Sequence, residues 1–147
     1  MALFEITHTS TVPIEAAWQR VTDWPRHGEH VPLTRIGVLT PPPNGVGTTF
    51  LARTGISRFG FDDPMEVTDW QPPSSTDPGR CRLQKRGTVM TGWAELTVAA
   101  DSTGSRTTWR EDIQVWKLPR FIDPATVLSS RLLFGRVLRR LVEDPQR

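Results

Sequence analysis

The sequence has few of the features that mark a disulfide-rich, secreted or membrane-spanning protein. Cys81 is its only cysteine, which excludes an internal disulfide and is typical of the reducing cytoplasm. No apolar run approaches the roughly 20 residues that cross a bilayer. The opening residues MALFEITHTS lack the basic start and apolar stretch of a secretory signal. We therefore expect a cytoplasmic protein without stable membrane insertion.

The sequence also lacks the short motifs of common cofactor-dependent and metal-dependent enzymes. It contains no phosphate-binding loop, no dinucleotide-binding glycine pattern, no His-Glu-x-x-His and no Cys-x-x-Cys. His27 and His30 have no evident third ligand nearby, so we interpret them as surface histidines and expect no metal and no cofactor. The net charge is only +2, which argues against a nucleic-acid partner.

What the sequence does contain is typical of one globular domain spanning residues 1–147. Apolar residues make up 37% of the chain and charged residues 23%, and a chain of this length can bury a core without metals or disulfides. Six Trp and six Phe occur without any Tyr. Tryptophan suits either a packed core or the wall of a cavity.

Residues 4–12 predict a half-buried strand. Apolar and polar positions alternate along the segment, as they do in a strand with one face against the core. Phe4, Ile6 and His8 share the face that we expect to be buried. Glu5 and its neighbours of the same phase share the other face.

A short amphipathic helix is expected directly after this strand. Pro13 suits the first turn of a helix, and apolar residues recur at helical spacing over Ile14–Val21. Pro25 disfavours helical geometry at the residue before it and therefore ends this helix. Residues 26–31 are compatible with a second short helical turn.

From about residue 33 the apolar period changes to two, which predicts a series of strands joined by turns. Pro64 lies inside one of them and indicates an edge position or a bulge, because proline cannot donate to the sheet ladder. The six expected strands are Arg35–Thr40, Val46–Arg53, Phe59–Trp70, Arg80–Arg86, Trp93–Ala99 and Thr107–Val115.

The carboxyl-terminal segment predicts a long amphipathic helix. Asp123 and Pro124 form a typical helix start, and the helix continues over Ala125–Glu143. Arg131 lies within the apolar face, where an arginine does not fit the pattern. The apolar face comprises Val127, Phe134, Val137, Leu138, Leu141 and Val142, and the opposite side carries Arg136, Arg139 and Arg140.

These elements predict an α+β fold. Strands in series with short connections form an antiparallel meander, and the long helix is the element best suited to cover its buried face. We expect a curved antiparallel sheet of about six or seven strands wrapped around the long helix, with one or two short helices after the first strand. The space between sheet and helix is a natural place for a cavity.

Three segments resemble the polyketide cyclase/dehydrase-like proteins of the START-like (SRPBCC) superfamily. They are TVPIEAAWQRVTDW at residues 11–24, DPMEVTDWQPP at 63–73 and SRTTWREDI at 105–113, and they occur in the matching order. The resemblance implies the helix-grip fold of that superfamily and an internal cavity for a hydrophobic ligand. Its members include aromatase/cyclases, lipid and sterol carriers, quinone-binding chaperones, co-chaperones and hormone receptors. The resemblance therefore does not choose among these activities.

Three residues are candidates for catalysis, namely His8, Glu111 and Arg131. An imidazole of His8 facing the cavity would serve as an acid, a base or a hydrogen-bond donor, and a structural role at the wet end of the strand is the alternative. A buried Arg131 would need a carboxylate, with Glu111 and Glu95 as the possible partners. Such a pair would polarise a ligand carbonyl, whereas a structural ion pair or an Arg131 that reaches the cavity mouth are the alternatives.

The last expectations concern two charged segments and the residues of the cavity wall. Residues 62–63 and 85–86, Asp-Asp and Lys-Arg, are interpreted as solvated cross-strand pairs. The candidate wall residues are Met65, Val67, Met90, Trp93, Trp109 and Phe134, with Met90 expected in a loop over the cavity entrance. The same set is also compatible with a packed core.

The sequence supports three kinds of function. The first is binding of a small hydrophobic ligand, with cofactor-independent cyclase or dehydrase activity on a polyketide-like substrate as an added option. The second is a non-enzymatic lipid or quinone carrier or chaperone. The third is a protein-interaction domain with a filled core. The ligand's identity, turnover and the oligomeric state stay open at this stage.

Overall fold

The computed structural model describes residues 2–56, 58–115 and 123–144, with only the backbone described at residues 2, 123–127, 129 and 130. The strands are β1 (Ala2–Ser10), β2 (Thr34–Val38), β3 (Thr49–Ile56), β4 (Phe59–Gln71), β5 (Gly79–Lys85), β6 (Met90–Asp101) and β7 (Gly104–Val115). The helices are α1 (Ile14–Val21), α2 (Trp24–His30) and α3 (Asp123–Glu143). None of the described helices is long and apolar enough to span a membrane.

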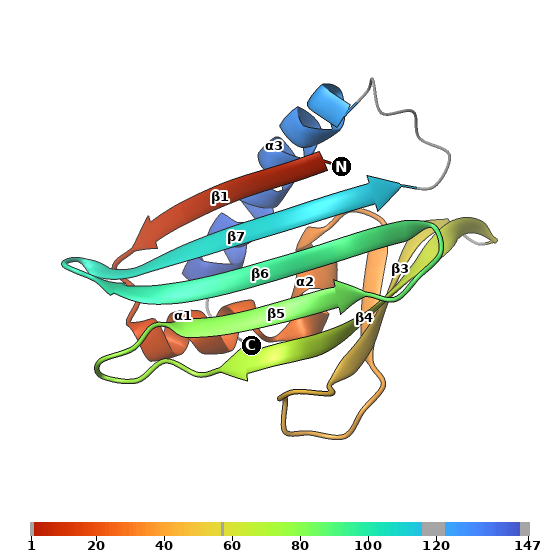
Figure 1. The fold of residues 1–147 in the computed structure, drawn as a ribbon. Coiled ribbons are helices and arrows are strands. Elements are labelled where there is room, and N and C mark those ends of the chain that lie inside the picture. Colours follow the sequence, from red (N-terminus) through yellow and green to blue (C-terminus); the bar gives the residue numbers. More distant parts are fainter. Residues whose placement is uncertain (1, 57, 116–122, 145–147) are drawn as a thin grey trace.

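The strands form one antiparallel seven-stranded sheet in the order β1-β7-β6-β5-β4-β3-β2. From β2 to β7 each strand pairs with the next along the chain, and β1 joins the far edge beside β7. The sheet curves, and all three helices lie on the same face of it (Figure 1). The expected α+β architecture, with its curved sheet, long helix and two short helices, is confirmed.

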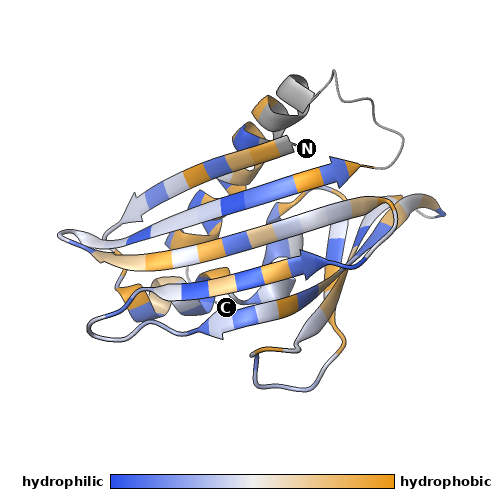
Figure 2. Cartoon of the chain, viewed as in Figure 1, coloured by the Kyte–Doolittle hydropathy of each residue, from blue (hydrophilic) through white to orange (hydrophobic). Residues whose placement is uncertain are grey.

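The alternation expected in the first strand is present in β1. Phe4 and Ser10 are buried, whereas Glu5, Thr7 and Thr9 are exposed. Figure 2 shows the same alternation of hydrophilic and hydrophobic positions along several strands of the sheet. Strands such as β1 and β5 thus present a mainly apolar face to the helices and a mainly polar face to solvent.

The second short helix, α2, begins earlier than expected. It starts at Trp24, with Pro25 in its first turn, where the fixed φ of proline and its missing N–H are tolerated. Pro25 therefore opens α2 as well as ending α1. Trp24 and His27 are both buried, so the interpretation of His27 as a surface histidine was wrong.

Pro64 lies in an interior strand, contrary to the expected edge position. It pairs with Leu51 of β3, but it lies one residue beyond the last β4–β5 pair, Met65 with Lys85. The Pro64 carbonyl accepts a hydrogen bond from the Arg86 N–H. The missing N–H of Pro64 therefore lies at the end of the β4–β5 ladder, where its absence costs at most one terminal bond. The bulge in β4 comes later, between Val67 and Asp69.

Strand β6 begins at Met90, three residues before the expected start. Gly92 lies within it at φ +125°, and a Cβ at this position would collide with the carbonyl oxygen of Asp112 on β7. Only glycine fits so close an approach of two strands. Met90 therefore belongs to the sheet and not to a loop.

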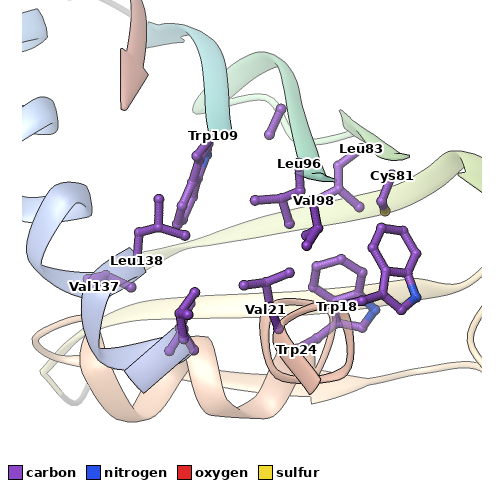
Figure 3. Packing of buried hydrophobic residues seen from close by; sticks show 14 of the residues in the cluster. Trp18, Val21, Trp24, Cys81, Leu83, Leu96, Val98, Trp109, Val137 and Leu138 are labelled. Atoms are coloured by element: carbon purple, nitrogen blue, oxygen red, sulfur yellow. The ribbon is translucent and has the colours of Figure 1, made fainter. Parts of the chain in front are cut away.

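Helix α3 covers the sheet mainly with its carboxyl-terminal half. Val137, Leu138, Leu141 and Val142 are buried, and Phe134 is half-buried, which agrees with the expected apolar face. Val127 has no described side chain. Figure 3 shows Leu138 of α3 and Trp109 of β7 pointing toward one another across the interior. On the other side of this interior, Trp18, Val21 and Trp24 of the short helices pack toward Cys81, Leu83 and Val98 of the sheet (Figure 3).

Candidate functional site

A cavity of about 250 Å³ lies between the sheet and the helices α2 and α3. Its walls are mainly apolar and rich in aromatic rings. The aromatic and methionine side chains that line it are Trp24, Phe50, Phe61, Met65, Met90, Trp109 and Phe134. They come from α2, α3 and four strands, so the cavity exists only when the sheet and the helices are assembled.

A wider groove of about 820 Å³ lies on the surface beside α2, β2 and β3. Its lining is more polar and includes Glu29, His30, Arg35 and Arg53. Val31 and Thr34 line both the groove and the cavity. The groove therefore borders the cavity on the β2 side.

A buried cluster of three charged side chains lines the cavity. Lys85 Nζ lies 2.7 Å from Asp63 Oδ2 and 3.3 Å from Glu111 Oε1, and 3.8 Å from Met65 Sδ. The three charged residues are all buried. They come from β4, β5 and β7, and the strand between β5 and β7 contributes Ala94 opposite Glu111. The small Ala94 side chain leaves room for the Lys85 and Glu111 side chains to meet.

Burial and mutual attraction act against each other in this cluster. Burial alone lowers the pKa of Lys85, but Glu111 and Asp63 together raise it above its ordinary value. The Lys85 amine therefore stays a charged ammonium. Burial also raises the pKa of Glu111, with Lys85 opposing the rise and Asp63 adding to it. Glu111 thus binds a proton more readily than an exposed glutamate does.

Several polar atoms of the cluster lack hydrogen-bond partners. Asp63 Oδ1 and Glu111 Oε2 are buried and unpaired, as is the indole N–H of Trp109. Trp109 lies close enough to Glu111 to favour its charged form, but the two groups do not meet in hydrogen-bonding geometry. Buried polar groups are usually paired, so this end of the cavity has unused capacity for hydrogen bonding.

His27 adds a neutral imidazole to the cavity wall. Its Nε2 lies 2.7 Å from the carbonyl oxygen of Val21 and donates its proton there, and its ring packs against those of Trp24 and Trp109. Burial lowers the pKa of His27 to about 4, against a smaller opposing effect of the Val21 hydrogen bond. The ring is therefore neutral at physiological pH, and Nδ1 is left with a lone pair.

The buried His27 makes folding stability depend on pH. In the unfolded chain its pKa is 6.5, and in the folded chain it is about 4. The stability that it contributes is therefore complete above pH 6.5 and is lost as the pH falls toward 4, by about 3 kcal/mol at most. Urea unfolding at neutral pH and near pH 4 measures this loss. His27→Gln keeps an N–H donor without titrating and should lose clearly less. An equal loss in both proteins would contradict the assignment of this pH dependence to His27.

The structure brings one of the three sequence candidates into the cavity. Glu111 lines it, but its partner is Lys85. Arg131 is exposed, so the expectation of a buried Arg131 paired with Glu111 was wrong. The reason is that the amino-terminal part of α3 is less covered, as the exposed Leu128 and Leu132 show. A helical face predicts burial only where another element covers it.

The other two expected groups lie away from the cavity. His8 Nε2 lies 2.7 Å from Glu143 Oε1 and is not among the lining residues. This matches the structural alternative for His8. Glu95 pairs with Arg80 and Arg82 on the opposite face of the sheet. The predicted pairing of Glu95 with Arg131 is therefore absent from the described residues.

The candidate wall residues fall into two groups. Met65, Met90, Trp109 and Phe134 line the cavity. Val67 is fully buried in the core without lining it. Trp93 lies on the outer face of the sheet, where the Arg82 guanidinium stacks 4.3 Å above its ring. Trp93 therefore contacts no ligand held in this cavity.

Lys85, Asp63 and His27 line the cavity, but the sequence did not predict them as site residues. Asp63 and Lys85 do pair across strands as expected, but the pair is buried, whereas the neighbouring Asp62 and Arg86 form exposed pairs with other residues. A signal for the burial was present in the sequence, because Cys81, Leu83 and Lys85 alternate along β5 and share its buried face. Burial on the same face raises the pKa of the Cys81 thiol to about 12.

The fold resembles that of many solved structures. The crystal structure of TTHA0849 from Thermus thermophilus superposes with a TM-score of 0.71 at 13% identity, covering 96% of this chain and 94% of that one. The Zhui aromatase/cyclase from Streptomyces sp. R1128 gives 0.66 at 13% identity, covering 95% and 92%. Ara h 8.0201 gives 0.63 at 14% identity, covering 97% and 98%.

No protein-family model matches the sequence, and no curated protein matches it significantly. The likeness therefore lies in the fold. The chain has the helix-grip, START-like fold that the sequence motifs led us to expect. Within the described residues no group of His, Cys, Asp and Glu side chains is arranged to hold a metal ion.

Proposed function

We propose that this protein, acting as a single cytoplasmic domain without a cofactor, binds a small and mainly apolar molecule in the cavity between the sheet and the helices. One observation supports the proposal above the others. An aromatic-walled cavity of about 250 Å³ has a buried Lys85, Asp63 and Glu111 cluster in its wall. A close-packed core contains few voids of this size, and sites for small molecules combine apolar walls with a few polar groups in this way.

The cavity volume limits the size of the ligand. Sites for drug-sized molecules measure roughly 300–1,000 Å³, and this cavity lies just below that range. A compact ring system fits such a volume better than a long acyl chain or a large polycyclic compound. The third possibility, an interaction domain with a filled core, is disfavoured by the cavity.

Catalysis on the bound molecule is the second candidate function, and the chemistry of Glu111 supports it. A carboxyl group whose pKa is raised can give a proton to a ligand carbonyl and take one from a neighbouring carbon. The Lys85 ammonium beside it would stabilise negative charge that develops on an oxygen. Cyclisation and dehydration need little more than these groups and a shaped cavity. A carrier would need only the apolar walls.

Native mass spectrometry of protein purified from its own host would identify the ligand. A bound small molecule supports the proposal, and an empty protein under conditions that preserve known complexes counts against it. Incubation of the isolated ligand with fresh protein then separates the two functions. A ligand recovered unchanged supports carriage, whereas a product lighter by one water supports dehydration.

Filling the cavity should abolish binding. Ala94 is buried and lines the cavity, so the ring of Ala94→Phe would occupy much of the space. We expect the affinity for naphthol, followed by the fluorescence of Trp24 and Trp109, to fall by about 100-fold or more. Ala99→Phe, on the outer face of the same strand, serves as the control. Equal affinities of the two variants would contradict the location of the site.

A further inference from the structure

The charged groups of the cavity wall do not balance. Among the described residues that line the cavity, the charged side chains are Asp63, Lys85 and Glu111. No arginine is among these described lining residues, and His27 is neutral. One ammonium is thus shared by two carboxyl groups, and the described cavity wall offers no second cation for an anion.

The hydrogen-bonding groups show the same imbalance. The Lys85 ammonium has three N–H groups, and Asp63 Oδ2, Glu111 Oε1 and Met65 Sδ lie around it at 2.7, 3.3 and 3.8 Å. Only the weak sulfur acceptor could be exchanged for a better partner. Asp63 and Glu111, by contrast, each keep one oxygen without a partner. The unused capacity of the three charged groups is therefore that of an acceptor. The unpaired donors of the cavity wall are the neutral indole N–H groups of Trp24 and Trp109, which match the oxygen of a hydroxyl group.

We infer, building on the proposed function, that the cavity selects uncharged ligands that bring a hydroxyl or similar hydrogen-bond donor to Asp63 and Glu111, and that it rejects carboxylates and phosphates. A donor reaching either carboxyl group gains a charge-assisted hydrogen bond in a site shielded from water. A carboxylate in the same position would meet two acidic groups and an ammonium that is already shared. The ligand class is thus an alcohol or phenol and not a fatty acid or a phospholipid.

Three probes with one ring system test this inference. Naphthol offers a neutral donor, methylnaphthalene offers none, and naphthoate carries a charge at neutral pH. In isothermal titrations we expect naphthol to bind about tenfold more tightly than methylnaphthalene, and naphthoate more weakly than either.

Other results with these probes would contradict either the inference alone or the proposed function as well. Naphthoate that binds as well as naphthol, or naphthol no better than methylnaphthalene, overturns the inference and leaves the proposed function intact. If none of the three binds, both are wrong.

Variants of the carboxyl groups locate the selectivity. Glu111→Gln removes one acidic group of the cavity, so the preference for naphthol over naphthoate should fall by about tenfold. Glu95→Gln removes a carboxyl group from the outer face of a neighbouring strand and should leave the preference unchanged. Asp63→Asn replaces Glu111→Gln if that variant unfolds, as judged by circular dichroism. An unchanged preference in a folded cavity variant overturns the assignment to the cluster.

Discussion

Replacing Lys85 with Met is expected to lower the free energy of unfolding by about 3–5 kcal/mol, the usual result of removing one partner from a buried ion pair. Methionine keeps an unbranched apolar side chain, so little packing is lost. What is lost is the ammonium 2.7 Å from Asp63 and 3.3 Å from Glu111. Both carboxyl groups would then be buried without a cation. Urea unfolding monitored by tryptophan fluorescence measures the change.

The pH dependence of this loss identifies its cause. The pKa of Glu111 is already raised in the folded protein, and Lys85→Met removes the cation that opposes the rise. Stability that depends on a protonated Glu111 is present at low pH and is lost as the pH rises through its folded-state pKa. The difference between wild type and variant should therefore be larger at neutral than at acidic pH. His27 is present in both proteins and cancels in this comparison.

A triple variant is the matched control for the single one. Replacing Asp63 with Asn and Glu111 with Gln in the Lys85→Met background removes the unpaired charges together with the ammonium. Because a buried ion cluster contributes little net stability over neutral groups, the triple variant should recover most of the loss. A single variant with near wild-type stability at neutral pH would show that the cluster is more hydrated than its burial indicates.

Trp24→Ala is expected to cost a similar amount, about 3–5 kcal/mol. Trp24 is 1% exposed, and its ring stacks on that of Phe50 with 4.8 Å between centroids. Because it also lines the cavity, its removal merges the space it leaves with one that already exists. Neighbouring side chains therefore have little chance to collapse into the gap. Thermal and urea unfolding both measure the loss.

Two comparisons separate the packing of Trp24 from its polarity. The indole N–H of Trp24 is buried without a partner, so Trp24→Phe removes no hydrogen bond and should cost much less than Trp24→Ala. Free indole should bind the space in Trp24→Ala and restore about 2.7 kcal/mol at 100 times its Kd. If Trp24→Phe were as destabilising as Trp24→Ala, an indole contact that the structure does not contain would be responsible.

The fold could be read from the sequence largely because local patterns determine it. The alternation in residues 4–10 and the helical spacing over Ile14–Val21 depend only on which side faces the core. The turns between strands are marked by proline, glycine and asparagine. The starts of α2 and β6 were placed wrongly because Pro25 and Gly92 have two possible roles each, and only the neighbouring strand or helix decides between them.

The site was harder to predict because its charges meet through contacts between distant strands. Lys85 alternates in phase with Cys81 and Leu83, but a charged residue next to Arg86 is usually solvated, and Lys85 was interpreted in that way. Burial of Lys85 depends on Glu111, which comes from a strand that is not adjacent to β5. Arg131 shows the reverse case, since its helical position suggested burial that the covering elements do not provide. One-dimensional patterns identify a face of an element but do not show how deeply it is covered.

The pairing of the first strand with the last has a consequence for synthesis of the chain on the ribosome. Thr7 of β1 meets Thr108 of β7, 101 positions away, and the buried Phe4 ring stacks on Phe134 of α3. As β1 leaves the exit tunnel, none of these partners has been made. Contacts of such sequence separation slow folding, and an unpaired apolar strand is prone to aggregate meanwhile. During synthesis β1 therefore stays without its sheet partner until β7 has been made, and the cavity wall cannot be complete before Phe134 of α3 is present.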